Sequence, residues 1–166
     1  MDRMHRVIYQ YCAMDTNDTI WKPNVTVAAV IERDGKFLLI EEETERGACF
    51  NQPAGHLEPN ESLVAGAIRE TLEESAYSFS PSALIGVYHY RHHAKQITYM
   101  RFAFTGDVSV HHKERALDTG IIRTVWMSPG EIRNCSDRLR TPLVMRCVED
   151  YLAGRRYPLD LITHYD

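Results

Sequence analysis

The chain has 166 residues, 44% hydrophobic and 25% charged, which is typical of one globular domain with its own core. A formal net charge of -4 argues against a protein held to nucleic acid by bulk electrostatics. No apolar run is long enough to span a bilayer, and the start, MDRMHRVIYQYC, lacks the apolar stretch of a secretory signal. We therefore expect a cytoplasmic protein without a membrane partner.

The pattern of strands and helices predicts a mixed α/β domain. Residues 1–20 are interpreted as an N-terminal extension and residues 21–166 as the domain itself. Asp34-Gly35 is a hairpin-turn signal between two β-prone runs. No glycine-rich phosphate loop of the two common kinds is present. In chain order we expect strands over 25–30 and 37–40, a loop over 51–55, a helix over 62–75, strands over 83–90 and 97–104, a loop over 107–120, a strand over 121–127, a short helix after Ser128 and a last helix over 142–153.

The helix expected over residues 62–75 has two different faces. Ser62 is a suitable N-cap. Glu70, Glu73 and Glu74 are spaced i, i+3 and i+4, so they share one face. The opposite face is predicted to be an apolar stripe of Val64, Ile68, Thr71, Leu72 and Ser75. Taken alone, the glutamates indicate either a solvated acidic face or a site for a hard divalent cation such as Mg²⁺.

The residues around this helix decide between the two. Gly55, five residues, Glu61, seven residues and then Arg69-Glu70-Thr71-Leu72-Glu73-Glu74 form one spaced pattern. It resembles the Nudix box, G-x5-E-x7-R-E-U-x-E-E-x-G-U, where U is a bulky apolar residue. Two positions depart from it, Thr71 for an aliphatic residue and Ala76 for glycine. Alanine at a helix end that needs positive φ costs about 1 kcal/mol or moves the end slightly.

The resemblance extends to segments that begin at Trp21, Asn51, Leu139 and Arg156, which are similar to a branch of bacterial phosphatases within the Nudix family. It implies an α/β/α sandwich around a mixed sheet. It also implies hydrolysis of phosphoanhydride bonds with Mg²⁺, Mn²⁺ being an alternative metal. The implied substrates are small molecules, namely nucleoside tri- and diphosphates and thiamine pyrophosphate or its hydroxymethylpyrimidine pyrophosphate precursor. A non-catalytic nucleotide-binding module, an enzyme for another nucleoside diphosphate derivative, and a monomer or a homodimer all remain open.

The same resemblance assigns roles to individual residues. Glu70, Glu73 and Glu74 would hold metal, with the carbonyl oxygen of Gly55 as a further ligand and Glu70 as the base. Arg69 would pair with Glu61 or a box glutamate and hold the loop to the helix. Asp118 is the candidate acid outside the box, a solvated loop acid being the alternative. The candidate substrate contacts are Phe50, Arg91 and Arg101, against the alternatives of core packing and a basic surface hairpin.

Overall fold

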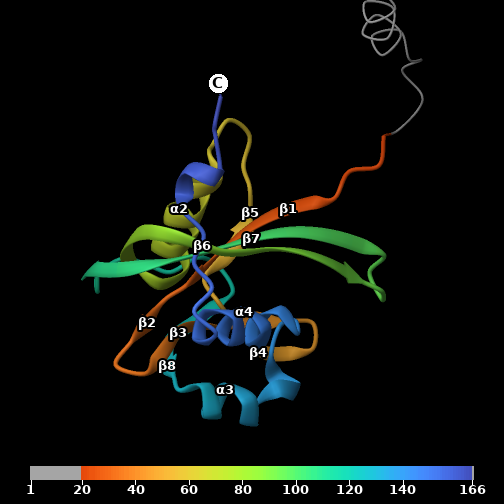
Figure 1. Ribbon diagram of the computed structural model, residues 1–166. Helices are drawn as coiled ribbons and strands as arrows, with labels where there is room; N and C mark the ends of the chain where they lie inside the picture. Colours follow the sequence, from red (N-terminus) through yellow and green to blue (C-terminus); the bar gives the residue numbers. More distant parts are fainter. Residues whose placement is uncertain (1–19, 166) are drawn as a thin grey trace, which may run out of the picture.

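The computed structural model describes residues 20–165, which form strands and helices in mixed order (Figure 1). Residues 1–19 lie outside this range, and so does nearly all of the expected N-terminal extension. The elements are β1 (Asn24–Val30), β2 (Glu32–Arg33), β3 (Lys36–Thr44), β4 (Gly47–Asn51), β5 (Ala54–His56), α2 (Leu63–Ser75), β6 (Tyr77–His92), β7 (Ile97–His111), β8 (Ile121–Met127), α3 (Pro129–Asn134), α4 (Leu143–Leu152) and two short 3-10 turns, Ser136–Arg138 and Leu159–Leu161.

Two four-stranded sheets form the centre of the domain. The first has the order β5-β1-β7-β6, and in it β1 runs parallel to β7 while the other pairs are antiparallel. The second contains β2, β3 and β4, with β8 also pairing with β3. Figure 1 shows α2 on one side of the first sheet and α4 on the other. The predicted α/β sandwich around a mixed sheet is confirmed.

Two buried clusters hold these layers together. Val27, Ala29 and Phe104 face the side covered by α2 through Ala67. Alternate residues of the same strands, such as Ala28 and Ala103, face the side of α4. This alternation follows from the two-residue period of a strand, and because both faces are covered, β1 is apolar along most of its length.

The hairpin prediction is confirmed, and several strand limits were wrong. Asp34 and Gly35 have φ of 53° and 75°, and they join the paired residues Arg33 and Lys36. The predicted loop at 107–120 begins only after His111, because β7 continues and pairs with the start of β6. The predicted loop at 51–55 contains part of β4 and of the short β5. These segments are stabilised by pairing with strands distant in sequence, which local composition does not show.

Helix α2 has the predicted ends, and its predicted buried face is partly right, because Thr71 and Ser75 are buried. Ser62 caps it by accepting a hydrogen bond from the Ala65 N–H. Ala76 takes the left-handed conformation with φ of 57° and ends the helix where glycine would. Ile68 is 38% exposed, whereas Glu70 is only 8% exposed, so the predicted apolar stripe was partly wrong. Within residues 20–165 no helix has the length and apolar character needed to cross a membrane.

Candidate active site

Arg69 joins the loop before α2 to the glutamates on the helix. Its Nε and Nη2 donate to the two carboxylate oxygens of Glu61 at 3.1 and 2.7 Å, and Nη2 also donates to the His56 carbonyl at 3.1 Å. Its Nη1 donates to Glu70 Oε1 at 2.8 Å and to Glu73 Oε2 at 3.0 Å. These hydrogen bonds hold the pKa of Glu61 below its ordinary value. The predicted pairing of Arg69 is present, and it fixes loop and helix together.

Glu70 lies directly against the backbone of Gly55. A Cβ atom added at Gly55 would overlap the Glu70 carboxylate, so only glycine leaves room for it there. Burial raises the pKa of Glu70, opposed by the Arg69 hydrogen bond. Its Oε2 atom has no hydrogen-bond partner among the described residues. Gly55 and Glu70 therefore form one unit. Arg69 binds one oxygen of the Glu70 carboxylate, and the other oxygen is available to a ligand.

Glu74 is the most strongly perturbed acid of the group. Its Oε2 accepts a hydrogen bond from the Ala54 N–H at 2.7 Å. Burial, together with the charges of Glu70, Glu42 and Asp118, raises the pKa of Glu74 to about 8. Burial therefore outweighs the single backbone hydrogen bond that favours the charged form of Glu74.

This pKa predicts how the metal-free protein responds to pH. The folded state holds a proton on Glu74 between about pH 4.5, the ordinary value, and about pH 8. In that range the native state binds more protons than the unfolded state. The contribution of Glu74 to the free energy of unfolding is therefore fully present below pH 4.5 and is lost as the pH rises through 8. We expect the free energy of unfolding to fall by about 2 kcal/mol between pH 6 and 8 in wild type. Glu74→Gln should remove that slope.

The measurement is urea unfolding at several pH values in EDTA, for wild type and for Glu74→Gln. Glutamine keeps an acceptor for the Ala54 N–H and cannot ionise. Parallel stability curves for the two proteins would show that Glu74 is not the group that titrates.

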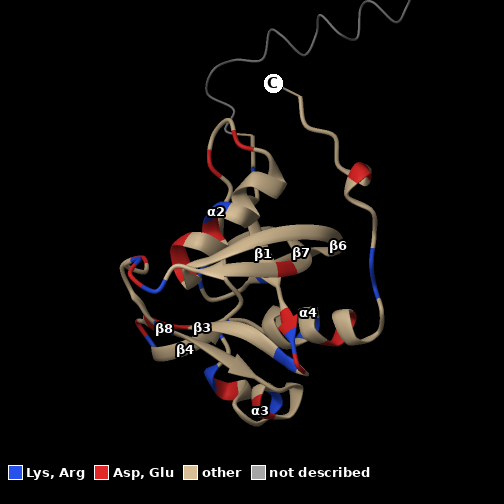
Figure 2. Ribbon diagram, turned by 90° about the vertical axis from the view of Figure 1, so that its left-hand side faces the viewer, with Lys and Arg blue, Asp and Glu red and all other residues tan. Residues whose placement is uncertain are grey.

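Asp118 lies near the box glutamates although it is exposed. Its N–H donates to the carbonyl oxygen of Glu73 at 3.1 Å, at the end of α2. Its charge contributes to the raised pKa of both Glu70 and Glu74. The loop before β8 is therefore close enough for Asp118 to act together with the glutamates of α2. Figure 2 shows acidic positions gathered along α2 and along the loop that precedes α2.

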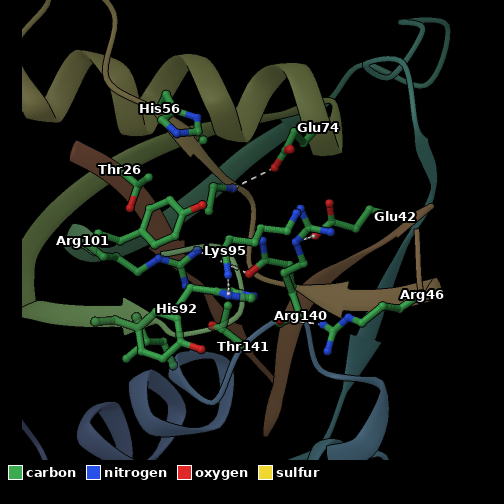
Figure 3. A pocket seen from close by; sticks show the side chains of 16 residues that line it. Thr26, Glu42, Arg46, His56, Glu74, His92, Lys95, Arg101, Arg140 and Thr141 are labelled. Atoms are coloured by element: carbon green, nitrogen blue, oxygen red, sulfur yellow. Dashed lines mark hydrogen bonds and ion pairs between the residues drawn. The ribbon is translucent and has the colours of Figure 1, made fainter. Parts of the chain in front are cut away.

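A cavity of about 320 Å³ opens beside these glutamates (Figure 3). Both sheets contribute to its wall, together with the end of α2 and the segment that leads into α4. Among the residues that the structure describes, two buried side-chain oxygens lack a hydrogen-bond partner, Glu42 Oε1 and Thr141 Oγ1, and both residues line this cavity. Because buried polar groups are normally paired, the cavity is suited to a polar ligand. Its lining residues are Thr26, Glu42, Arg46, Asn51, Ala54, Gly55, His56, Glu74, Tyr90, His92, Lys95, Tyr99, Arg101, Arg140, Thr141 and Leu143.

Comparisons with known proteins agree with this geometry. The family model described as NUDIX domain matches residues 21–146. The chain belongs to the Nudix family. It is 38% identical to the phosphatase NudJ of Escherichia coli strain K12 over 147 residues, which cover 89% of this chain and 95% of that protein.

Solved structures show the same relationship. A Nudix hydrolase from Nitrosomonas europaea superposes with a TM-score of 0.85 and 53% identity, covering 87% of this chain and 98% of that one. A MutT protein from Methanosarcina mazei Go1, at 24% identity and a TM-score of 0.65 over 83% of this chain and all of that one, shares the fold. As a Nudix hydrolase related to NudJ, the protein acts on phosphorus-containing acid anhydrides of small molecules.

The Nudix box carboxylates suit the divalent cation that such hydrolases use. Glu70 and Glu74 are buried acids with raised pKa values, and Gly55 leaves a space that any side chain would fill. Among residues 20–165 no ready-made group of three or more acidic, thiol or imidazole side chains surrounds one point. The reason is visible in the contacts, because Glu70 and Glu73 turn to Arg69 while Glu74 turns to Ala54.

Only one of the three predicted substrate contacts of this Nudix protein lines the cavity. Arg101 does. Phe50 is 5% exposed within the core, where the guanidinium of Arg138 covers its ring at 4.6 Å. Arg91 is exposed on the β6–β7 hairpin and donates to Gln96. Phe50 therefore packs in the core, which was the alternative to a substrate contact.

Sequence reasoning missed the residues that reach the cavity from distant segments. Glu42 belongs to β3, and Arg140 and Thr141 precede α4. Arg140-Thr141-Pro142 was visible as a helix start and as part of the Nudix resemblance, without any indication that its side chains would meet the box. Only the register of β3 and the closure of α4 against β6 bring them together.

Proposed function

We propose that the protein is a Mg²⁺-dependent phosphohydrolase that cleaves phosphoanhydride bonds in nucleoside tri- and diphosphates, and in thiamine pyrophosphate or its pyrimidine precursor. The observation that supports this most is the row of Glu70, Glu73 and Glu74 beside a cavity that contains both Glu74 and Gly55. The relationship to a phosphatase of E. coli supports the substrate range. Mn²⁺ would substitute for Mg²⁺ at carboxylate ligands.

The proposed metal ligands are the three box glutamates, the carbonyl oxygen of Gly55 and Asp118. When bound there, Mg²⁺ would neutralise the phosphate oxygens and make the attacking water more acidic. Arg69 donates to both Glu70 Oε1 and Glu73 Oε2 and so fixes these two carboxylates relative to each other until a metal ion binds. Arg69 and Glu61 thus support catalysis by positioning.

Glu70 is the proposed base. Its raised pKa makes it a stronger base than an ordinary glutamate. Its Oε2 has no hydrogen-bond partner in the described part of the chain and can take the proton from water while Oε1 stays bound to Arg69. The water oxygen then forms a bond to phosphorus, the bridging P–O bond breaks, and the leaving phosphate carries away the electron pair.

The test is Glu73→Gln, assayed for phosphate release with and without Mg²⁺. Glu73 is a suitable position because its side chain is 28% exposed and pairs, within residues 20–165, with Arg69 alone, so the variant should fold. Loss of one metal-binding carboxylate should reduce Mg²⁺-dependent turnover at least tenfold. The matched control is Glu149→Gln, an exposed glutamate on α4, which should keep full activity.

The substrate panel should contain nucleoside tri- and diphosphates, thiamine pyrophosphate and a sugar nucleotide, with phosphate and pyrophosphate measured separately. Preference for the first three supports the proposed range. Preference for the sugar nucleotide would instead indicate an enzyme for another nucleoside diphosphate derivative. Tight nucleotide binding with no turnover by folded wild type would contradict hydrolysis and favour a binding module.

A further inference from the structure

The cavity has two chemically different ends. Figure 3 shows Glu74 and His56 beside the helix, and Arg101, Arg140 and Thr141 farther from it. The first end belongs to the Nudix box, where the acids gather. The cavity as a whole is nevertheless cationic, since four arginine and lysine side chains line it against two carboxylates. A cationic end has no role in holding a metal ion, so it requires a separate explanation.

Arg101 is the most telling of these cations. It is only 7% exposed, and within residues 20–165 no carboxylate lies at ion-pair distance from it. Its guanidinium makes two long hydrogen bonds, both 3.4 Å, to the side-chain oxygens of Gln52 and Asn51. Burial lowers the pKa of Arg101, yet an arginine stays protonated in proteins. The carboxylates of Glu74 and Glu42 act on Arg101 only at longer range, and a buried cation that makes no ion pair is costly unless a ligand supplies the negative charge.

Three neighbours offer further donors to the same ligand. The Thr141 hydroxyl is buried, has no hydrogen-bond partner among residues 20–165 and can donate a hydrogen bond. Arg140 Nε is 3.7 Å from Glu42 Oε1, an ion pair too long to count as a hydrogen bond, and no other described residue pairs with that oxygen. Lys95, on the β6–β7 hairpin turn, lines the cavity as well and is half-exposed. These donors come from three separate segments of the chain.

We propose that Arg101, Thr141 and Arg140 form a second anion subsite, which binds a phosphate group of the substrate apart from the diphosphate at the Nudix box. Arginine is suited to this because its planar fork donates two parallel hydrogen bonds to one phosphate. The inference rests on the proposed function only for the position of the reacting diphosphate. The anion subsite would favour substrates that carry a phosphate in addition to the reacting diphosphate. That phosphate is either the third phosphate of a nucleoside triphosphate or a phosphate on the group beyond the diphosphate.

The first experiment measures binding without metal or turnover. Inorganic phosphate is titrated calorimetrically into wild type, Arg101→Met and Arg133→Met in EDTA. Arg133 is exposed on α3 and is not one of the residues that line the cavity, so its variant is the matched control. We expect phosphate to bind wild type and the control equally, and Arg101→Met at least tenfold more weakly. Because the substitution removes a buried charge that makes no ion pair, the Tm of Arg101→Met should equal or exceed that of wild type.

The second experiment identifies the source of the phosphate. KM is compared between wild type and Arg101→Met for a nucleoside diphosphate, the triphosphate, and a 3′-phosphorylated nucleoside 5′-diphosphate. A rise in KM confined to the triphosphate assigns the subsite to the third phosphate. A rise confined to the 3′-phosphorylated compound assigns it to the group beyond the diphosphate. Equal changes for all three substrates would overturn the proposal.

Two further results would also overturn it. Wild type and Arg101→Met could bind inorganic phosphate equally. Alternatively, the variant could lose affinity for an uncharged nucleoside and not for phosphate, which would show that Arg101 contacts a nucleobase. Failure of hydrolysis is a separate result, because phosphate binding in EDTA does not require the box glutamates to turn over substrate. An inactive wild type that binds phosphate through Arg101 would therefore reject the proposed function and keep the anion subsite.

Discussion

Arg69→Met is expected to lower the free energy of unfolding of the metal-free protein by about 3 kcal/mol, or roughly 6–12 °C in Tm. Methionine preserves much of the side-chain volume and removes the charge. Glu61, Glu70 and Glu73 then lose their shared cation, and the loop loses its hydrogen bonds to the helix. The effect is smaller than for a fully buried ion pair because the Arg69 side chain is 23% exposed.

Mg²⁺ gives this prediction a second readout. A divalent cation supplies positive charge to the same glutamates, so it should raise the Tm of Arg69→Met more than that of wild type. Thermal unfolding is measured in EDTA and in Mg²⁺, with Arg133→Met as the control that leaves all box contacts in place. If Arg69→Met melted like the control in EDTA, Arg69 would not be the principal counter-ion of the box.

The box helix shows what a sequence pattern can predict. The spacing of Gly55, Glu61 and Arg69 correctly predicted that loop and helix are held together, since these identities act within one short segment. Ser62 and the position of Ala76 were sufficient to place both helix ends. Local signals succeed here because the contacts that fix the helix lie within about twenty residues of one another.

The same helix also shows where the pattern misleads. Periodicity assigned Ile68 to the buried face and Glu70 to the exposed face, and the structure has Ile68 at 38% exposure and Glu70 at 8%. The packed face consists of small residues, namely Ala67, Thr71 and Ser75. The hydroxyls of Thr71 and Ser75 donate hydrogen bonds to backbone carbonyl oxygens one turn earlier in the helix. A functional helix turns its acids toward a cavity, so its polarity does not simply follow burial.

The cavity was the least predictable part of the molecule. Thr26, Arg101 and Arg140 are separated by many residues and meet only because β1 pairs in parallel with β7 and the segment before α4 closes over both. Arg101 was expected to contact phosphate as a member of a basic stretch, together with Arg91. The structure separates the two arginines, placing one in the cavity and the other on the exposed hairpin. The direction of each side chain depends on strand register, which composition does not encode.

Gly55→Ala is expected to reduce Mg²⁺-dependent turnover about 100-fold while changing the free energy of unfolding by less than about 1 kcal/mol. The added methyl would overlap the carboxylate of Glu70, the proposed base. The obstruction is the end of a flexible side chain, so the fold can relieve it by moving that carboxylate. Gly55 does not have positive φ, so alanine causes no backbone strain there. Gly55→Ala should therefore lose activity while keeping nearly all of its stability.

Gly130→Ala is the matched control, because a Cβ there would approach nothing closer than Ser128 Oγ at 4.0 Å. Steady-state kinetics and urea unfolding are measured on both variants. Wild-type turnover in Gly55→Ala would mean that Glu70 works from another position, and the case for it as the base would fail. A large loss of stability would mean instead that the backbone of β5 moves, since Gly55 pairs with Val27 of β1. Loss of turnover in a protein of normal stability would show that the glycine of the box is required because the catalytic carboxylate occupies the space beside it.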